Sequence, residues 1–475
     1  MASDSIANKK PAGRYKHLRQ AGWHKIKKLI TSNSKKMSFL KIAVIYVVIL
    51  WSTWHKLDPD FGWHLVVGDY IRHHWVPIHD IYAYTAHNVS WIDHEWANNV
   101  LVSWLYQWGG YGLLSVVYAG LWTAAICLFR KRVRLFILVI AFLAIVPYIG
   151  VRTTVWGVLG IAILVELLER RTRKSIAVIP LLFLVWANLH GSFVLGFAVL
   201  GYYGLKRREL KYFYLLVICI LASFINPYGP RLYDAIANIL FDPAVHGQIT
   251  EWRSFWLFST TWPFIILWGV GFLLFSKNKL SNWVGLAPIM LLASLSASRY
   301  LPIFVTVALR DIDDYSPLYK LPKNLDKPRK TIVAAFFIVV LGVIGYFGYS
   351  AYTSNNRESG YPQPAVSYLM LHSCHGNLFN DYDYGGYLIW KLPSVPVYID
   401  GRMPTWRYPS GQTYMARYLE IFNDTRVQKS EFKRYDIGCA LLPNGYMNSQ
   451  IAKNLKRAGW RDVVSGNGSF LLVKP

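Results

Sequence analysis

The sequence predicts a polytopic α-helical membrane protein with a small extracytoplasmic α/β domain at its C-terminus. Three observations favour this fold class. Of the 475 residues, 54% are hydrophobic, and they gather in runs long enough for membrane spans. Clusters of lysine and arginine stand at the ends of these runs, as the positive-inside rule expects of cytoplasmic loops. After residue 350 the composition changes to that of a soluble domain.

The basic residues give a formal net charge of +25. Because they follow the ends of apolar runs and not one face of a domain, we expect them to contact membrane lipids, and we expect no nucleic acid binding. Residues 1–38 hold ten lysines and arginines and a single acid, Asp4, which predicts a cytoplasmic tail. The first apolar run, from Phe39, lacks a small-residue cleavage site and is expected to stay as the first helix.

The basic clusters also set the expected topology. They lie at 130–134, 170–174, 206–211, 277–279 and 310–330. Two spans between successive clusters give helices at 112–129, 134–149, 152–168, 176–190, 192–205, 212–225, 261–276, 282–297, 299–310 and 331–350. With the first helix, the transmembrane domain at 39–350 has about eleven spans. We expect a multi-pass protein of the plasma membrane, with its N-terminus in the cytoplasm and the domain at 351–475 outside the cytoplasm.

The first outer loop, 58–111, is the most polar part of the predicted transmembrane domain. It carries six acidic residues and six of the thirteen histidines of the chain. Tryptophans are spaced through it in a pattern that predicts two surface helices, at about 60–74 and 94–108. Proton-transfer and metal-ligand side chains gathered between apolar spans indicate an active-site loop.

The C-terminal domain is expected to form a small sheet with helices. Strands are predicted at 377–380, 395–400, 437–442, 462–464 and 469–473, and helices at 363–372, 386–392, 412–422 and 448–458. Cys374 and Cys439 lie beside and within two of these strands. If the strands are parallel neighbours, the two sulfurs come within bonding distance. The alternative is a pair of free cysteines, of which Cys439 would be a small buried hydrophobe.

Several short motifs accompany this topology: Asp58-Pro-Asp60-Phe-Gly-Trp63-His64, His94-Glu95-Trp96, Trp186-Ala-Asn188-Leu-His190-Gly191, Asn226-Pro-Tyr-Gly229, Glu251-Trp252, and Asn380-Asp381-Tyr with Gly385-Gly386-Tyr387. As a set they resemble a bacterial branch of the GT-C superfamily of membrane glycosyltransferases, which includes protein O-mannosyltransferases and the catalytic subunit of oligosaccharyltransferase. The resemblance implies a polyprenyl-phosphate-linked sugar donor and inverting transfer to a glycan, lipid or protein acceptor. Relatives more often carry a bulky residue at the position of Gly62, which leaves the shape of the nearby pocket open.

Carboxylates of the first outer loop are the candidate catalytic groups. Inverting transfer needs a base for the acceptor proton, and Asp60 is our candidate. Asp58 is the second choice, because Pro59 makes it the better structural residue. The alternative is that both aspartates only cap the surface helix. Glu95 is a candidate second carboxylate, although the helix dipole alone favours an acid at that position.

The departing phosphate calls for cations. The candidate phosphate-binding residues are Arg299, His64, His190 and Arg152. Arginines at helix ends can equally reach lipid headgroups, and a histidine in an apolar turn is often simply a buried, satisfied one.

Three further residues, Glu251, Asp400 and Arg402, are candidates for contact with the acceptor or, for Glu251, for a second acid. His94 is a candidate metal ligand, and a divalent cation such as Mg²⁺ or Mn²⁺ is a candidate cofactor. Adjacent residues on a helix point about 100° apart, so His94 and Glu95 are not expected to share an ion.

A second function class stays open at this point. A polyprenyl-lipid flippase or a non-catalytic subunit for assembly of a cell-envelope polymer would have a similar hydrophobic pattern. Acids concentrated in outer loops favour the enzyme, since a transporter carries ionisable groups in the middle of its spans.

Overall fold

The computed structural model describes residues 39, 42–87, 89–128, 135–242, 247, 249–255, 261–276, 285–314, 357–446, 449–466 and 468–475. The chain divides into two compact units, Met1–Val48 and Ile49–Pro475. The second unit holds both the later apolar helices and the C-terminal sheet. The predicted span at 331–350 and the basic clusters at 130–134 and 277–279 lie outside the described residues, as does most of the cluster at 310–330.

Two helices of the first outer loop lie in the segments where surface helices were predicted. Helix α2 spans Phe61–His73, and helix α3 spans Trp96–Leu128. Helix α3 departs from helical geometry at Gly109 and Gly110, where Gly110 has a φ of 58°. Glycine takes this conformation without a steric penalty, so the chain can change direction there. The part before the kink corresponds to the predicted surface helix, and the part after it to the predicted span at 112–129.

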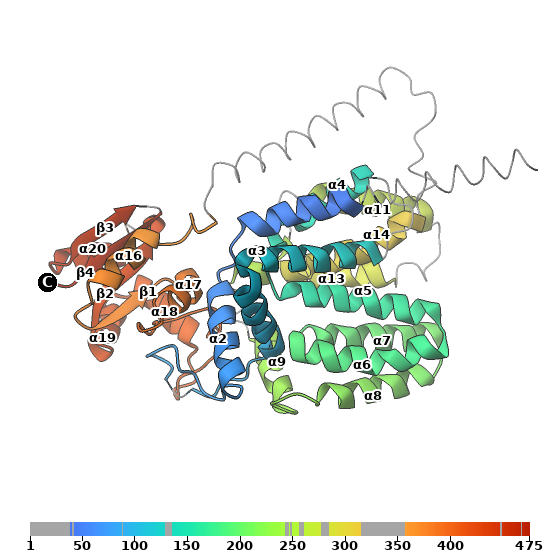
Figure 1. Ribbon diagram of the computed structural model, residues 1–475, viewed down its shortest axis with the longest axis horizontal. Helices are drawn as coiled ribbons and strands as arrows, with labels where there is room; N and C mark the ends of the chain where they lie inside the picture. The colour runs from blue at the N-terminus through green and yellow to red at the C-terminus, as the bar shows by residue number, and fades with distance from the viewer. Residues whose placement is uncertain are drawn as a thin grey trace, which may run out of the picture. The chain divides into compact units, whose positions relative to one another are not determined.

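The other apolar helices also match predicted spans. They are α4 (Leu135–Ile145), α5 (Thr154–Arg170), α6 (Arg173–Leu189), α7 (Phe193–Arg207), α8 (Lys211–Ser223), α11 (Trp262–Ser276), α13 (Leu286–Ser296) and α14 (Leu301–Asp314) (Figure 1). Among the described helices, only α3 is long and apolar enough to cross a membrane by itself, while Ile42–His55 and several others are shorter apolar helices. Eleven spans therefore stay a prediction.

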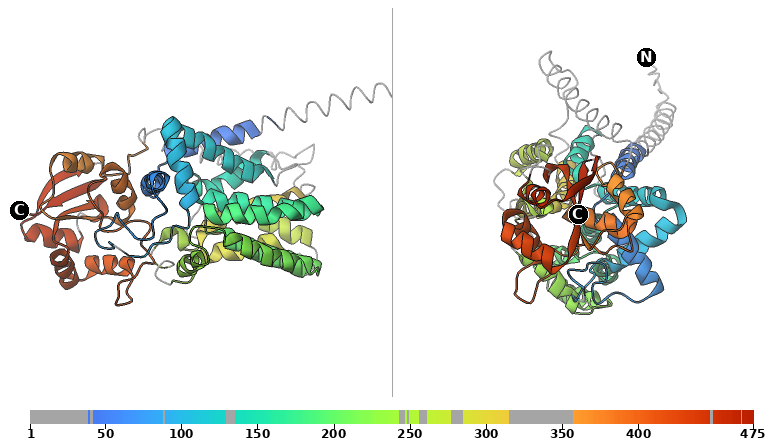
Figure 2. Two further views of the ribbon diagram at one scale, coloured as in Figure 1. Left: turned by 60° about the horizontal axis from the view of Figure 1, so that its bottom comes forward. Right: turned by 90° about the vertical axis from the view of Figure 1, so that its left-hand side faces the viewer.

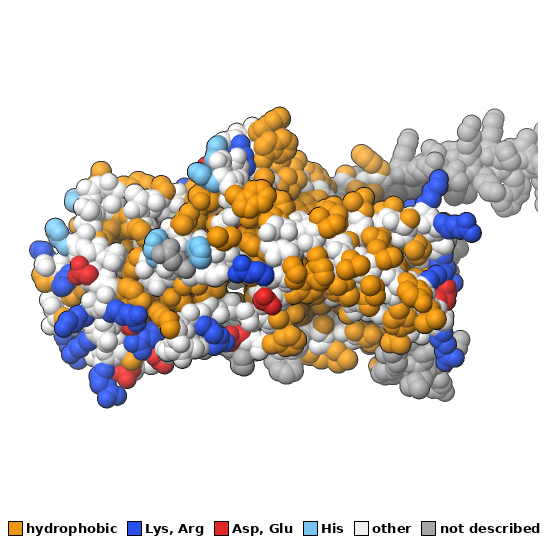
Figure 3. Space-filling view, turned by 90° about the horizontal axis from the view of Figure 1, so that it is seen from below, with side chains coloured by type: hydrophobic (Ala, Val, Ile, Leu, Met, Phe, Trp, Pro, Cys, Tyr) orange, Lys and Arg blue, Asp and Glu red, His pale blue; other side chains and the backbone are white. Residues whose placement is uncertain are grey.

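The surface of the helical part is apolar on the face that carries α8. Exposed side chains there include Tyr214, Val217 and Leu221 of α8, together with Leu181 of the neighbouring α6. Figure 3 shows hydrophobic side chains covering this part, with lysines and arginines at its end and over the C-terminal domain. An apolar belt with basic residues beyond it is the surface expected against lipid.

Helix α9, Arg231–Phe241, was not predicted. It follows the Asn226-Pro-Tyr-Gly229 turn, in which Gly229 has a φ of 56° and the side chain of Asn226 accepts from the backbone N–H of Tyr228. The helix buries Leu232 and Ile236 and exposes Phe241. Its alternating apolar and polar residues are too few for a span, which is why a search for long apolar runs passes over it.

The C-terminal part forms a four-stranded sheet in the order β1-β2-β4-β3. The strands are β1 (Asn377–Asn380), β2 (Ile437–Pro443), β3 (Arg461–Gly466) and β4 (Ser469–Val473). Strand β1 pairs in parallel with β2, and the other pairs are antiparallel. The flanking helices are α16 (Gln363–Leu371), α17 (Gly385–Lys391), α18 (Tyr414–Asn423), α19 (Thr425–Arg434) and α20 (Gln450–Arg457) (Figure 2). Only α19 was missed, since its sequence is almost wholly polar.

The strand predicted at 395–400 is wrong, because this segment does not join the sheet. Val397 pairs instead with the first outer loop: its N–H donates to Tyr82 O at 3.0 Å, and its carbonyl accepts from Tyr84 N at 3.2 Å. The side chain of Asn380 takes the neighbouring backbone groups, since its oxygen accepts from Tyr398 N and its amide donates to Ile399 O. The segment therefore fastens the loop to the C-terminal domain.

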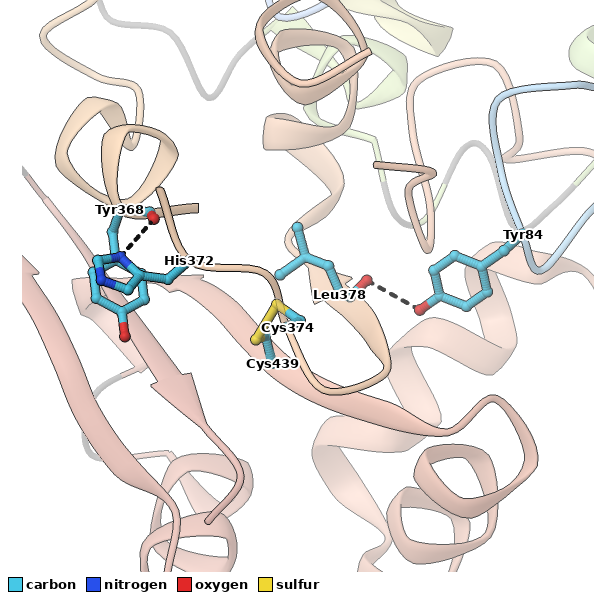
Figure 4. The surroundings of a disulfide bond; sticks show 6 residues. All are labelled: Tyr84, Tyr368, His372, Cys374, Leu378 and Cys439. Atoms are coloured by element: carbon cyan, nitrogen blue, oxygen red, sulfur yellow. Dashed lines mark hydrogen bonds between the residues drawn. A yellow bond between two sulfur atoms is a disulfide. The ribbon is translucent and has the colours of Figure 1, made fainter. Parts of the chain in front are cut away.

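The disulfide between Cys374 and Cys439 is present, with a Cα–Cα distance of 5.8 Å (Figure 4). The parallel pairing of β1 with β2, in which Leu378 lies opposite Cys439, brings the two residues together. Figure 4 also shows Tyr84 of the outer loop donating to the carbonyl of Leu378. The crosslink thus lies next to a strand that the loop contacts.

We expect the double substitution of Cys374 and Cys439 by serine to lower the stability of the protein. The bond closes a loop with a sequence separation of 65 residues. Chain entropy alone then gives at most about 4 kcal/mol, measured by thermal unfolding without reductant. Cys127→Ser, at a cysteine outside the disulfide, is the matched control. Alkylation of both thiols in the unreduced, folded protein would contradict the bond.

Candidate functional site

A cavity of about 720 Å³ is lined by residues of both the first outer loop and the C-terminal domain. Its lining comes from the loop, from the turn before α5, from α9 and η2 (Thr250–Trp252), and from the segments that follow β1 and precede α18. The predicted site residues that line it are Asp58, Asp60, His64, His94, Glu95, Arg152, Glu251, Arg299 and Arg402. Groups distant in the sequence therefore meet in one place, as the predicted topology required.

Asp58 and Asp60 form a tight turn at the start of α2. The backbone N–H of Asp60 donates to Asp58 Oδ1 at 3.0 Å. Asp60 occupies the N-cap position but makes no capping hydrogen bond with its side chain. Its Oδ1 instead accepts from the indole N–H of Trp63 at 2.9 Å. The helix-capping alternative thus fails for Asp60, whereas the turn-forming role fits Asp58.

The surroundings of Asp60 raise the pKa of its carboxyl group. It is half-buried at the cavity wall, and it lies against Gly401 of the C-terminal domain, where a Cβ would come 1.9 Å from its Oδ1. Burial, followed by the negative charge of Asp58, raises the pKa of Asp60 to about 8. A carboxyl group with a pKa near the working pH is suited to take up a proton and release it.

Arg152 lies beside this turn. It stands in the turn between η1 (Val146–Tyr148) and α5, and its guanidinium forms ion pairs with both Asp58 and Glu251. Its side chain is 14% exposed, against 5% for Asp58 and 27% for Glu251. Burial alone raises the pKa of Glu251, but Arg152 and then Arg299 outweigh burial, so the pKa lies below its ordinary value. Glu251 is therefore ionised, and the predicted phosphate ligand Arg152 is engaged by carboxylates.

Glu95 lies at the centre of three histidines. Its Oε1 is 3.2 Å from His190 Nε2 and 3.6 Å from His94 Nε2, and its Oε2 is 3.7 Å from His64 Nε2. Burial is the main cause that raises the pKa of Glu95, and burial lowers the pKa values of the histidines, that of His94 to about 4. The imidazoles are thus neutral groups at neutral pH.

Hydrogen bonds fix which ring nitrogen of His190 carries the proton. Ser192 N donates to His190 Nδ1 at 3.1 Å, and Ser192 Oγ, which accepts from Trp186, lies 2.7 Å from the same nitrogen. Nδ1 is therefore the acceptor, and Nε2–H faces Glu95. The motif Trp186-Ala-Asn188-Leu-His190-Gly191 acts here by orienting a carboxylate.

Asp93 and Asn99 support the histidine cluster, and the sequence analysis missed both. Asn99 Oδ1 lies 2.5 Å from His64 Nδ1, and Asn99 Nδ2 donates to Asp93 Oδ2 at 2.8 Å. Asp93 Oδ1 in turn accepts from Glu95 N. Burial is the main cause that raises the pKa of Asp93 to about 7. A signal was available in the pair Asn98-Asn99, which interrupts a run of large apolar residues.

A second, smaller pocket of about 80 Å³ adjoins the cavity. It shares His94, Thr154, Trp252 and Arg299 with the larger cavity, and the rest of its lining is mainly aliphatic. The guanidinium of Arg299 stacks over the ring of Trp252, 4.6 Å from its centre. The structure thus brings Arg299, His94 and His190 together at an apolar pocket.

The opposite wall of the cavity is acidic and aromatic. It includes Asp381, Tyr382, Asp383, Tyr418 and Tyr446 of the C-terminal domain. Tyr418 donates to Asp381 Oδ2 at 2.9 Å, which makes Asp381 part of the scaffold. Burial and then the charge of Asp58 raise the pKa of Asp383. The run Asp381-Tyr-Asp383-Tyr was quoted as a motif, but nothing in the sequence shows that it faces the outer loop.

Asp400 and Arg402, predicted to contact the acceptor, have a structural role instead. Arg402 Nη2 is 2.6 Å from Asp400 Oδ2, and Nη1 is 2.7 Å from Asp80 Oδ1. The three side chains are at most 1% exposed. Trp91 and Trp406 lie against the guanidinium. This ion-pair cluster joins the first outer loop to the C-terminal domain and leaves no free group for a ligand.

Gly62, where relatives carry a bulky residue, does not shape a pocket. A Cβ at Gly62 would come 2.0 Å from the carbonyl oxygen of Gly386, and one at Gly386 would come 2.3 Å from the carbonyl oxygen of Pro59. Helices α2 and α17 therefore touch backbone to backbone. This contact sets the distance between the Asp58-Pro-Asp60 turn and the C-terminal domain.

The described residues do not fit a divalent cation. The described part of the chain contains no group of three or more histidine, cysteine or acidic side chains arranged around an ion position. Asp58 and Glu251 point their oxygens at Arg152, and the three histidine nitrogens surround the Glu95 carboxylate. His94 is thus placed as a neighbour of Glu95, with no other ligand that would complete a metal site.

Comparison with solved structures identifies a similar fold. No protein-family model matches the sequence, and no curated protein does. Among solved structures, the chain is similar to the archaeal oligosaccharyltransferase AglB from Archaeoglobus fulgidus, solved with an inhibitory peptide and a dolichol-phosphate. The match has a TM-score of 0.52 at 11% identity and covers 93% of this chain and 74% of that one. The chain has the GT-C fold. At this identity the likeness shows the fold and not the reaction.

We expect Arg402→Ala to destabilise the protein by about 3–5 kcal/mol, because it leaves Asp80 and Asp400 buried without a counter-charge. Thermal or denaturant unfolding in detergent measures the change. Arg426→Ala, in the same domain with a side chain 93% exposed, is the control and should be nearly neutral. An unchanged unfolding midpoint for Arg402→Ala would show that the cluster does not join the two parts.

Proposed function

We propose that the protein transfers a sugar from a polyprenyl-phosphate carrier to a hydroxyl or amide acceptor, with inversion at the anomeric carbon. The observation that carries the proposal is the position of Asp60. Its carboxyl group lines the cavity and has a pKa of about 8. The same cavity contains Arg299, which it shares with the smaller pocket, and the aromatic residues of the C-terminal domain. The GT-C fold and a membrane location agree with a lipid-linked donor.

In the proposed reaction the acceptor atom, a hydroxyl oxygen or an amide nitrogen, attacks the anomeric carbon. The new bond forms as the bond between this carbon and the phosphate oxygen breaks. The acceptor proton passes to Asp60, and the electron pair of the broken bond leaves with the phosphate. Asp58 acts through Asp60, because it fixes the turn and its charge raises the pKa of the base.

The phosphate is proposed to lie beside Arg299. Among the described residues, Arg299 forms no ion pair within 4 Å, and its neighbours His94 and His190 offer polar ring nitrogens. A fixed positive charge where negative charge develops lowers the barrier to transfer. The aliphatic lining from Ile236, Ile239 and Ile303 suits the first isoprene units of the carrier.

The acceptor is proposed to enter against Tyr382, Asp383 and Tyr446. Aromatic faces with nearby carboxylates bind hydroxyl-rich molecules, and a glycan, lipid headgroup or protein side chain offers such groups. The known complex of the solved neighbour holds a peptide, so a peptide acceptor belongs among the candidates.

The flippase alternative is the weaker proposal. The carboxylates of the site lie in turns and at helix ends: Asp60 precedes α2, Glu95 precedes α3, and Glu251 lies in a short 3-10 helix. A transporter needs ionisable groups along the path through its spans.

We expect Asp60→Asn to reduce transfer by about 10²–10⁴-fold, because the amide cannot accept the proton. The purified protein is assayed with a panel of polyprenyl-phosphate hexoses, and sugar release and transfer are followed by mass spectrometry. Asp69→Asn, on the same helix with a side chain 54% exposed, is the matched control. Full activity of a folded Asp60→Asn protein would remove Asp60 from the mechanism.

The rate should also rise with pH. The base must be ionised, and its pKa of about 8 places the half-maximal rate near pH 8 instead of near pH 4. Asp58→Asn removes a negative neighbour, which lowers the pKa of Asp60 and moves the rising limb of the kcat profile to lower pH. A profile that does not move would show that Asp58 does not influence the base.

A further inference from the structure

One guanidinium pairs with two carboxylates beside the Asp58-Pro-Asp60 turn, and a third carboxylate, that of Asp60, belongs to the same turn. Arg152 pairs with Asp58 through Nε and with Glu251 through Nη2, two nitrogens of the same planar group. Gly150 leaves room for this arrangement, since a Cβ there would come 3.2 Å from Arg152 Cγ. The side chain reaches the carboxylates from a short turn and has little freedom to move away.

The same oxygens are those that a divalent cation would need. A hard cation in place of the guanidinium would bind the two carboxylates that Arg152 now pairs with, Asp58 of the outer loop and Glu251 of η2, while Asp60 belongs to the same turn as Asp58. Two of the three already hold the guanidinium, and an ion among them would lie within a few ångströms of its positive charge. Burial lowers the pKa of Arg152 only in part, and the two carboxylates reverse the effect, so the group stays charged.

The guanidinium also accounts for the state of Asp60. With Asp58 and Glu251 neutralised, Asp60 is the carboxylate of the three without an ion pair in the described part of the site. It can therefore exchange a proton without breaking an ion pair. Arg299, which stacks on Trp252 and forms no ion pair within the described part of the chain, remains for the phosphate.

We propose that Arg152 is the built-in cation of this site, and that it takes the place of a divalent metal ion between Asp58, Asp60 and Glu251. Arg152 is then a positioning residue that acts through the carboxylates, and not a phosphate ligand. The inference that transfer needs no added metal rests on the proposed function. The inference that no metal binds among these carboxylates does not.

The test is a binding measurement on the purified full-length protein with Mn²⁺ alone, followed by the electron paramagnetic resonance of the free ion. We expect no Mn²⁺ site that depends on Asp58 in the unmodified protein. One bound ion per chain, lost in Asp58→Asn, would overturn the proposal. This readout needs neither donor nor acceptor, so it stands whether or not transfer is ever observed.

Variants at Arg152 test whether its guanidinium takes the place of a metal ion. Arg152→Ala should gain about one Mn²⁺ site per chain, since Asp58 and Glu251 lose their cation, and the added Asp58→Asn should remove the site. Arg152→Lys keeps the charge and should gain none. A folded Arg152→Ala protein that binds no Mn²⁺ contradicts the proposal, and if this variant does not fold, the measurement on the unmodified protein decides.

A transfer assay gives the second readout. The unmodified protein should keep its rate in excess EDTA, and Arg152→Ala should lose activity and recover part of it with Mn²⁺. Loss of the unmodified protein's activity in EDTA, restored by Mn²⁺, would refute the proposal. If Asp60→Asn is fully active while Mn²⁺ still fails to bind, the proposed base is wrong and the role of Arg152 as built-in cation stands.

Discussion

The close packing of the C-terminal domain on the first outer loop is the constraint on which the site depends. Backbone meets backbone where Gly62 faces Gly386, and the Asp80, Asp400 and Arg402 cluster closes the contact with buried charges. A buried ion pair of this kind adds little net stability compared with apolar packing, but it tolerates the loss of neither partner. It therefore fixes the register of two parts that are far apart in sequence.

Electrostatics divides the cavity into two regions. Near α2, the charges of Asp58 and Glu251 are balanced by Arg152, and Asp60 is left to exchange protons. At the smaller pocket, Arg299 stands beside neutral histidines and apolar residues. Lined by acids on one side and by a cation on the other, the cavity suits a reaction in which a proton and a phosphate leave in different directions.

The positions of the apolar helices, of the two helices in the first outer loop and of the site carboxylates could be predicted. They follow from the apolar runs of the sequence and from the charged residues between these runs. What the sequence could not supply are contacts between distant residues. The pairing of Val397 with Tyr82 looks like a strand until its partner is known, and Asp400 and Arg402 look like ligands until Asp80 is placed beside them. Arg152 was expected at a phosphate for the same reason.

The contact between Gly401 and Asp60 limits how the protein can evolve. The carboxyl group of Asp60 occupies the space that a side chain at position 401 would need. The proposed base and the C-terminal domain are therefore sterically matched to each other. Neither can be exchanged for the corresponding part of a relative unless the other comes with it. Recombination between related genes at a point between the first outer loop and this domain should then seldom yield an active protein. The loop and the C-terminal domain should therefore be inherited together.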